Sequence, residues 1–173
     1  MRLFLAIRLN PSEQHALRDQ TQAILQRKTV KATHSEFYHA TIHFFGETSE
    51  NKTRQLKQAL ALVEQQSFQY ALDGFESFGK HTLYAKIGKG NDAFQRLRKT
   101  VERIFKLKPE EFTPHVKIAR NNRLHSKEVN KLLEELNQQK KEVVCDATEL
   151  HLIDSQETPN GRLYHAIAFK RFS

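Results

Sequence analysis

The chain has 173 residues, of which 38% are hydrophobic and 28% charged, the size and composition of a single globular domain. One cysteine, Cys145, excludes an intrachain disulfide framework, and no apolar run approaches the roughly 20 residues of a membrane-spanning helix. The net charge of +8 favours polyanionic partners, chiefly nucleic acid, although a basic surface also suits a protein that binds none. We therefore expect one domain over residues 1–173, no membrane partner and a cytoplasmic location.

Apolar residues recur at helical spacing in four stretches, with strand-like runs between them. In chain order, the patterns predict a strand over 2–9, a helix over 11–28, a strand over 38–45, a helix over 49–66, strands over 68–76 and 82–88, a helix over 92–106, a strand over 114–120, a helix over 126–141, and strands over 143–153 and 163–171. Each helix has a polar back, so each should pack on one side only. An α+β fold with helices against one face of a sheet is the predicted class. The first strand is short and interrupted by Arg2 and Arg8, which argues against a signal peptide.

The element order is repeated along the chain. A helix, a strand with a histidine, a helix and two strands occur around His39 and again around His115. The strands that follow resemble each other weakly, with Tyr84 and Tyr164 at matching places. Two interpretations stay open: two similar lobes that face each other, or a chance likeness between two common βαββ units.

The segment Phe37–Glu47 (FYHATIHFFGE) is the first candidate site. Alternation along a strand predicts a polar face and an apolar face, formed by His39, Thr41 and His43 and by Ala40, Ile42 and Phe44 respectively. An imidazole exchanges protons near neutral pH, and a hydroxyl two residues away can bind the same phosphate. His39 and His43 would suit zinc on a helix, but on a strand their Cα atoms lie roughly 13 Å apart, so we expect no metal site.

The segment Phe112–Arg120 (FTPHVKIAR) repeats this arrangement. Pro114 disfavours a helix, and alternation places His115 and Lys117 on the face opposite the apolar side chains. Arg120, at the end of the strand, either reaches an anion or pairs with a surface carboxylate. Either segment alone is unremarkable in a chain with nine histidines. Two of them, in corresponding places of a basic chain, indicate a shared phosphate site.

These residues resemble the two-histidine (2H) phosphoesterases. Residues 39–42 match the family's H-x-T-x motif, and residues 37–46 look like the first motif of its RNA 2′,3′-cyclic phosphodiesterase branch, historically called 2′-5′ RNA ligases. Residues 112–120 look like the second motif, and residues 1–7 and 152–161 also fit. The resemblance implies two pseudo-symmetric lobes, each an antiparallel sheet backed by helices, around a central catalytic cleft.

The same resemblance implies hydrolysis of RNA 2′,3′-cyclic phosphate ends to 2′-phosphates. It makes His39 the proton donor and His115 the proton acceptor. The substrate, an RNA or nucleotide with a 2′,3′-cyclic phosphate, would be bound by Thr41, Lys117, Arg120 and His43, although His43 also suits a place at the rim. A cation beside His115 disfavours its imidazolium form, so Lys117 supports the role of His115 as the base. We expect no cofactor and a monomer.

Lys117 departs from the family pattern, which has threonine at this position. Two alternatives to hydrolysis therefore remain: formation of 2′-5′ linkages by the reverse reaction, and an RNA-end binding module whose catalysis Lys117 impairs. No nucleotide-binding loop is evident, which disfavours ATP-driven joining. Three aromatic residues either stack on a base or pack in the core, namely Tyr84, Tyr164 and Phe45. The other histidines should be structural or solvent-facing, namely His15, His34, His81, His125, His151 and His165.

Overall fold

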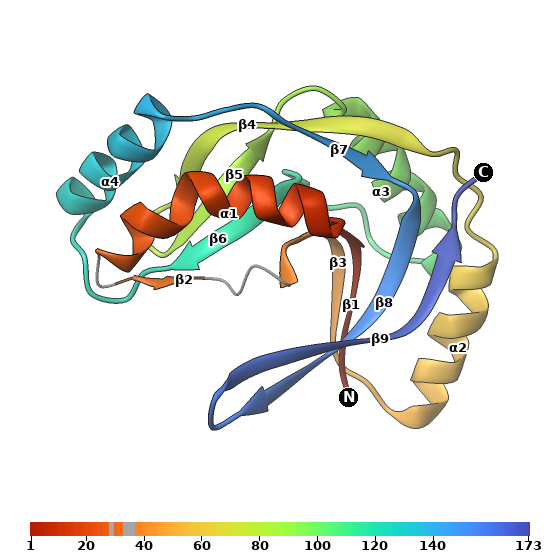
Figure 1. The fold of residues 1–173 in the computed structure, drawn as a ribbon. Coiled ribbons are helices and arrows are strands. Elements are labelled where there is room, and N and C mark those ends of the chain that lie inside the picture. The colour runs from red at the N-terminus through yellow and green to blue at the C-terminus, as the bar shows by residue number, and fades with distance from the viewer. Residues whose placement is uncertain (28–29, 33–36) are drawn as a thin grey trace.

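The computed structural model describes residues 1–27, 30–32 and 37–173 (Figure 1). Four helices lie in these residues: α1 (Pro11–Gln26), α2 (Glu50–Ala61), α3 (Asn91–Phe105) and α4 (Ser126–Gln138). The strands are β1 (Arg2–Arg8), β2 (Lys31–Ala32), β3 (His39–Glu47), β4 (Phe68–Phe78), β5 (Thr82–Ile87), β6 (His115–Arg120), β7 (Val143–Ala147), β8 (Glu149–Thr158) and β9 (Gly161–Arg171). The predicted α+β class is confirmed. Lys28, the last residue of the first predicted helix, and His34 lie outside the described residues.

The strands form one antiparallel sheet in the order β7-β4-β5-β6-β3-β1-β8-β9, with β2 beside β6. A single residue pair, Ala40 with Val116, joins β3 to β6. The sheet therefore divides into a first lobe, β3-β1-β8-β9, and a second lobe, β6-β5-β4-β7 with β2. The predicted bilobal arrangement is confirmed.

Two helices back each lobe, and two of them are exchanged between the lobes. Helix α1 follows β1 of the first lobe and leads through the short β2 to β3, but it packs against β7 and α4 of the second lobe. Helix α3 connects β5 to β6 of the second lobe but packs against β3 and α2. Figure 1 shows α2 and α3 together on one side of the molecule and α4 on the other. This exchange holds the lobes together, because their separation would expose the apolar faces of α1 and α3 to solvent.

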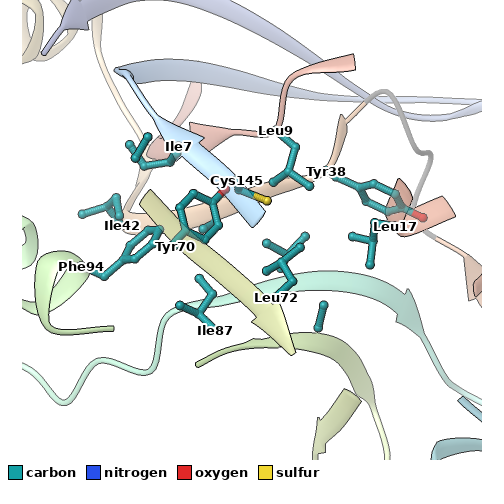
Figure 2. Close-up of a cluster of buried hydrophobic side chains, with 14 of the residues drawn as sticks. Ile7, Leu9, Leu17, Tyr38, Ile42, Tyr70, Leu72, Ile87, Phe94 and Cys145 are labelled. Carbon is teal, nitrogen blue, oxygen red and sulfur yellow. The ribbon is translucent and has the colours of Figure 1, made fainter. Parts of the chain in front are cut away.

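The hydrophobic core is shared by the two lobes (Figure 2). Ile7 and Ile42 come from strands of the first lobe, and Tyr70, Leu72 and Cys145 come from strands of the second. The apolar stripes of the helices enter the same core, among them Leu17 and Ile24 of α1, Leu56 and Leu60 of α2, Phe94, Leu97 and Val101 of α3, and Leu132 and Leu136 of α4. Full burial of a leucine or phenylalanine side chain stabilises the fold by about 1.5–3 kcal/mol. The apolar side chains at helical spacing therefore hold the helices against the sheet.

Several element boundaries differ from the predicted ones, and two of these differences follow directly from backbone pairing. The strand predicted over 143–153 is interrupted at Thr148, since β7 pairs with β4 in the second lobe and β8 pairs with β1 in the first. The helix predicted over 49–66 ends at Ala61, because the chain after it pairs with the C-terminus. The N–H of Ser67 donates to the carbonyl of Ser173, and the N–H of Ser173 donates to the carbonyl of Gln65.

Candidate active site

The two motif histidines begin neighbouring strands, His39 on β3 and His115 on β6. These strands are antiparallel, and the pair that joins them is Ala40 opposite Val116. Both of these side chains are fully buried in the core. Because successive side chains of a strand point to opposite faces, the two histidines point away from the core.

The same register places the two motifs side by side on neighbouring strands. Continued by one residue each way, it sets His39 across from Lys117 and His115 across from Thr41. All four side chains line one cavity of about 540 Å³, a volume typical of small-ligand sites. His43 lines it too. The predicted central cleft is present, and it brings together five of the six predicted site residues.

One backbone contact holds each motif histidine. Nδ1–H of His39 donates to the carbonyl of Phe37 at 2.5 Å, and Nδ1–H of His115 donates to the carbonyl of Thr113 at 2.9 Å. A carbonyl only accepts, so each neutral imidazole carries its proton on Nδ1. No residue in the described part of the chain is hydrogen-bonded to either Nε2 atom. Both Nε2 lone pairs are therefore available for proton transfer.

Each motif histidine also packs between a phenylalanine and a tyrosine. The ring centroids are 5.0, 5.3, 4.8 and 5.1 Å apart in the pairs His39–Phe4, His39–Tyr164, His115–Phe78 and His115–Tyr84. Tyr164 and Tyr84 are the tyrosines at matching places in the doubled sequence pattern, so the repeat corresponds to equivalent positions in the two lobes. Tyr84 is only 4% exposed, as core packing predicts, whereas Tyr164 lines the cavity.

Burial lowers the pKa of both motif histidines. Loss of solvation is the main cause of the fall in the pKa of His39 from 6.5 to about 4; the hydrogen bond to Phe37 opposes it, and the charge of Lys117 adds to it. The pKa of His115 is also lowered, chiefly by burial, with Lys117 again contributing. Lys117 is thus one of the groups that disfavour the imidazolium form of His115, as the sequence pattern predicts. The same charge acts on His39, however, so it does not distinguish the two histidines.

Strand β3 does not alternate throughout, which alters the prediction for His43. A shift of register with β1 sets Thr41 opposite Ala6 but His43 opposite Leu5, a core residue. Thr41 and His43 therefore do not share one face, because an extra residue, Ile42, separates them. His43 is turned towards α3, although its side chain still lines the cavity.

Phe44 is displaced to the cleft by the same irregularity. Strict alternation places it in the core, but it is 47% exposed and lines the cavity. Its ring stacks on Phe4 with the centroids 5.1 Å apart, and the guanidinium of Arg2 lies 5.8 Å from its centroid. The prediction for Phe44 was wrong, and its ring forms an exposed aromatic surface against Phe4 in the cleft.

Arg120 is the one predicted site residue that the structure does not bring into the cavity. It is exposed at the end of β6. Its charge still reaches the site: burial lowers the pKa of Lys117, and the charges of Arg162, Arg120 and Lys31 lower it further. The Lys117 side of the cleft is therefore strongly basic.

Several lining residues were not predicted from the sequence, including Phe4, Phe78, Arg98, Glu110, Phe112 and Arg162. Arg98 had a usable signal. It stands four residues after Phe94, within the apolar stripe of α3, where a charged residue is unexpected. The others come from segments whose meeting is set by the tertiary fold.

Comparison with known proteins identifies the family. A model of the 2′-5′ RNA ligase superfamily matches residues 7–159, so the chain belongs to this superfamily. Two relatives are called RNA 2′,3′-cyclic phosphodiesterase. The one from Aeropyrum pernix is 31% identical over 100 residues, which are 53% of this chain and 57% of that protein. The one from Geobacillus stearothermophilus is 34% identical over 97 residues, 50% of this chain and 31% of that protein.

Solved structures share the fold at low sequence identity. E. coli LigT without ligand aligns over 99% of this chain and 97% of its own, with a TM-score of 0.80 and 16% identity. The structure of TT0787 from Thermus thermophilus covers the same shares, with a TM-score of 0.75 and 19% identity. E. coli LigT has also been solved with 3′-AMP, at a TM-score of 0.78 and 16% identity, over 99% of this chain and 98% of that one.

Among the described residues, no helix combines the length and apolarity needed to cross a membrane. The same part of the chain contains no group of three or more histidine, cysteine, aspartate or glutamate side chains that could hold a metal ion.

Proposed function

We propose that this protein hydrolyses the 2′,3′-cyclic phosphate of RNA ends to a 2′-phosphate. One observation carries the proposal: two imidazoles on neighbouring strands line one cavity, each held through Nδ1 by a backbone carbonyl, beside a hydroxyl and an ammonium group. Acid/base chemistry at phosphorus needs two such proton-transfer groups. The names of the two relatives support this substrate, and the 3′-AMP complex of E. coli LigT supports a nucleotide in the cleft.

The reaction assigns one proton transfer to each histidine, in roles that follow the family resemblance. Nε2 of His115 removes a proton from water as the water oxygen attacks phosphorus. The bond between phosphorus and O3′ breaks, and Nε2–H of His39 delivers a proton to O3′. The products are a 2′-phosphate and a 3′-hydroxyl. Each transfer is worth about 10²–10⁴-fold in rate.

Thr41 and Lys117 bind the anion in this scheme. The hydroxyl of Thr41 donates to a phosphoryl oxygen, and the ammonium of Lys117 offsets the negative charge. The anion also solves a difficulty at His39. With a pKa of about 4, this histidine is neutral at pH 7 before substrate binds. A bound phosphate favours the imidazolium and raises the pKa of His39, so the acid gains its proton as the substrate binds.

The test is a panel of nucleoside 2′,3′-cyclic monophosphates and short RNAs with cyclic ends, incubated with the protein in EDTA and followed by ³¹P NMR. We expect the 2′-phosphomonoester as the product. A parallel incubation of cyclic-ended RNA with 5′-hydroxyl RNA measures 2′-5′ joining. Binding of the cyclic ends without any product would instead favour an RNA-end binding module and overturn the proposal.

A further inference from the structure

Arg98 of α3 is a buried cation on the wall of the cavity, with only 5% of its surface exposed. Its guanidinium makes directed contacts. Nε donates to Oε1 of Glu102 at 2.8 Å, and Nη1 donates to the carbonyl of Ile42 at 2.5 Å and to Nδ1 of His43 at 2.9 Å. The guanidinium thus links α3 to β3 at its irregularity and holds His43, which lines the cavity.

The contact with Arg98 fixes the tautomer of His43. Arginine cannot accept a hydrogen bond or lose its proton in a protein, so Nδ1 of His43 must be the acceptor. The proton of the neutral imidazole therefore lies on Nε2, where no described residue is hydrogen-bonded to it. This tautomer is the opposite of the one that backbone carbonyls impose on His39 and His115.

The surroundings of His43 also keep its imidazole neutral. Burial and the charge of Arg98 lower its pKa, and the nearby carboxylates of Glu110 and Glu102 oppose them. His43 is therefore neutral at pH 7 and donates from Nε2 without carrying a charge. Protonation at Nδ1 would cost the hydrogen bond from Arg98, which further disfavours proton exchange at this residue.

We propose that Arg98 is a positioning residue that holds His43 as a neutral hydrogen-bond donor to the nucleoside part of the substrate. The inference rests on the proposed function and deepens it. His39 and His115 lie on the same face as Thr41, whereas the irregularity at Ile42 turns His43 towards α3 and Arg98. We therefore place the phosphate between His39 and His115 and the nucleoside in the part of the same cavity beside His43. The acceptor is an oxygen or nitrogen of the ribose or base, so His43 acts in binding and not in proton transfer.

The first test reads the tautomers directly and needs no activity. Long-range ¹H–¹⁵N spectra of the imidazoles should show Nδ1–H for His39 and His115 and Nε2–H for His43. The double variant R98M/E102Q removes the guanidinium without leaving a buried carboxylate unpaired, and should convert His43 to a mixture of tautomers. The single variant Glu102→Gln is the matched control and should leave the Nε2–H form in place. Nδ1–H on His43 in the wild-type protein, or no change in R98M/E102Q, would overturn the proposal.

The second test separates binding from catalysis. His43→Leu and R98M/E102Q should each raise KM for a nucleoside 2′,3′-cyclic monophosphate about three- to tenfold, the worth of one hydrogen bond, with little change in kcat. Inhibition by inorganic phosphate should not change. Because Arg98 acts through His43, combining His43→Leu with R98M/E102Q should raise KM no further than either variant alone. Additive increases in KM, or an equal weakening of inhibition by phosphate, would contradict the proposal. If the protein turns nothing over, the same comparison is made with dissociation constants, so failure of the proposed function is recognised separately.

Discussion

His39 and His115 share the details that matter for proton transfer. Each donates Nδ1–H to the carbonyl two residues before it and packs between a phenylalanine and a tyrosine. The motifs that contain them could be recognised from the sequence because the residues that define a motif lie close together in the chain. Arg98 could not be placed beside His43 in this way, since 55 residues separate them. Only the fold brings α3 to β3.

Lys117→Thr tests the electrostatics of the pair. For the free protein, the limbs of the pH profile of kcat/KM report the pKa values of the acid and the base. Both histidine pKa values are lowered, so both limbs should lie below pH 6.5 in the wild-type protein. Loss of the ammonium charge should raise both pKa values and move both limbs to higher pH.

The matched control for this variant is Lys127→Thr, which removes an exposed lysine from the first turn of α4. Its profile should coincide with that of the wild-type protein. A shift of one limb alone in Lys117→Thr would mean that the charge acts on a single histidine. No shift in either limb would refute the electrostatic role of Lys117.

At the scale of elements, the sequence identifies helices and strands but not their irregularities. The apolar stripes predicted for the helices are buried, and the two motif strands lie where their patterns place them. The extra residue at Ile42 and the interruption at Thr148 were not predictable in this way. Both depend on the strand that pairs with the segment, which lies far away in the chain. The irregularity at Ile42 is what turns His43 towards Arg98.

Gly90, immediately before α3, is a position where the fold requires glycine. Its φ is +87°, and a Cβ atom there would lie 2.6 Å from Cβ of Tyr70 and 2.7 Å from the carbonyl oxygen of Gln69. Gly90→Ala should lower the free energy of unfolding by about 3 kcal/mol, because backbone strain and a steric clash add. Urea unfolding measures the loss.

Gly79→Ala serves as the control for Gly90→Ala. Gly79 also has a positive φ, +54°, but nothing lies within 4 Å of its added Cβ. It should cost only about 1 kcal/mol, the strain of the left-handed conformation alone. Equal losses in the two variants would show that the close approach of α3 to β4 is not tight.

At the scale of the whole molecule, the doubled order of elements predicted the two lobes. It could not predict that α1, which follows β1 of the first lobe, packs on the second lobe, or that α3, which connects two strands of the second lobe, packs on the first. A helix would bury the same apolar stripe whether it packed on its own lobe or on the opposite one, so the stripe alone does not predict the exchange. The central cleft is its consequence, because the lobes are held together while β3 and β6 share only one residue pair.

The buried histidines make the fold sensitive to acid. The pKa of His39 is about 4 in the folded protein, against a usual value of 6.5. Between these values the unfolded chain binds more protons, so the free energy of unfolding should fall as the pH falls from 6.5 to about 4. His39 alone contributes up to about 3 kcal/mol. The pKa values of His43, His115 and His151 are lowered too, so they act in the same direction.

Urea unfolding of the wild-type protein and of His39→Asn, at several pH values between about 7 and 4, measures this contribution. The variant should lose less stability over that range, although it is less stable than the wild-type protein at neutral pH. Parallel curves for the two proteins would mean that His39 titrates normally in the folded state.

Hydrolysis of a nucleoside 2′,3′-cyclic monophosphate by His39→Ala and His115→Ala is the decisive test of the two-histidine mechanism. The rate should be measured at saturating substrate, with the fold of each variant verified by its unfolding curve. We predict that each substitution lowers kcat by about 10²–10⁴-fold. Near-wild-type hydrolysis by either variant would contradict the mechanism and remove that histidine from the chemistry.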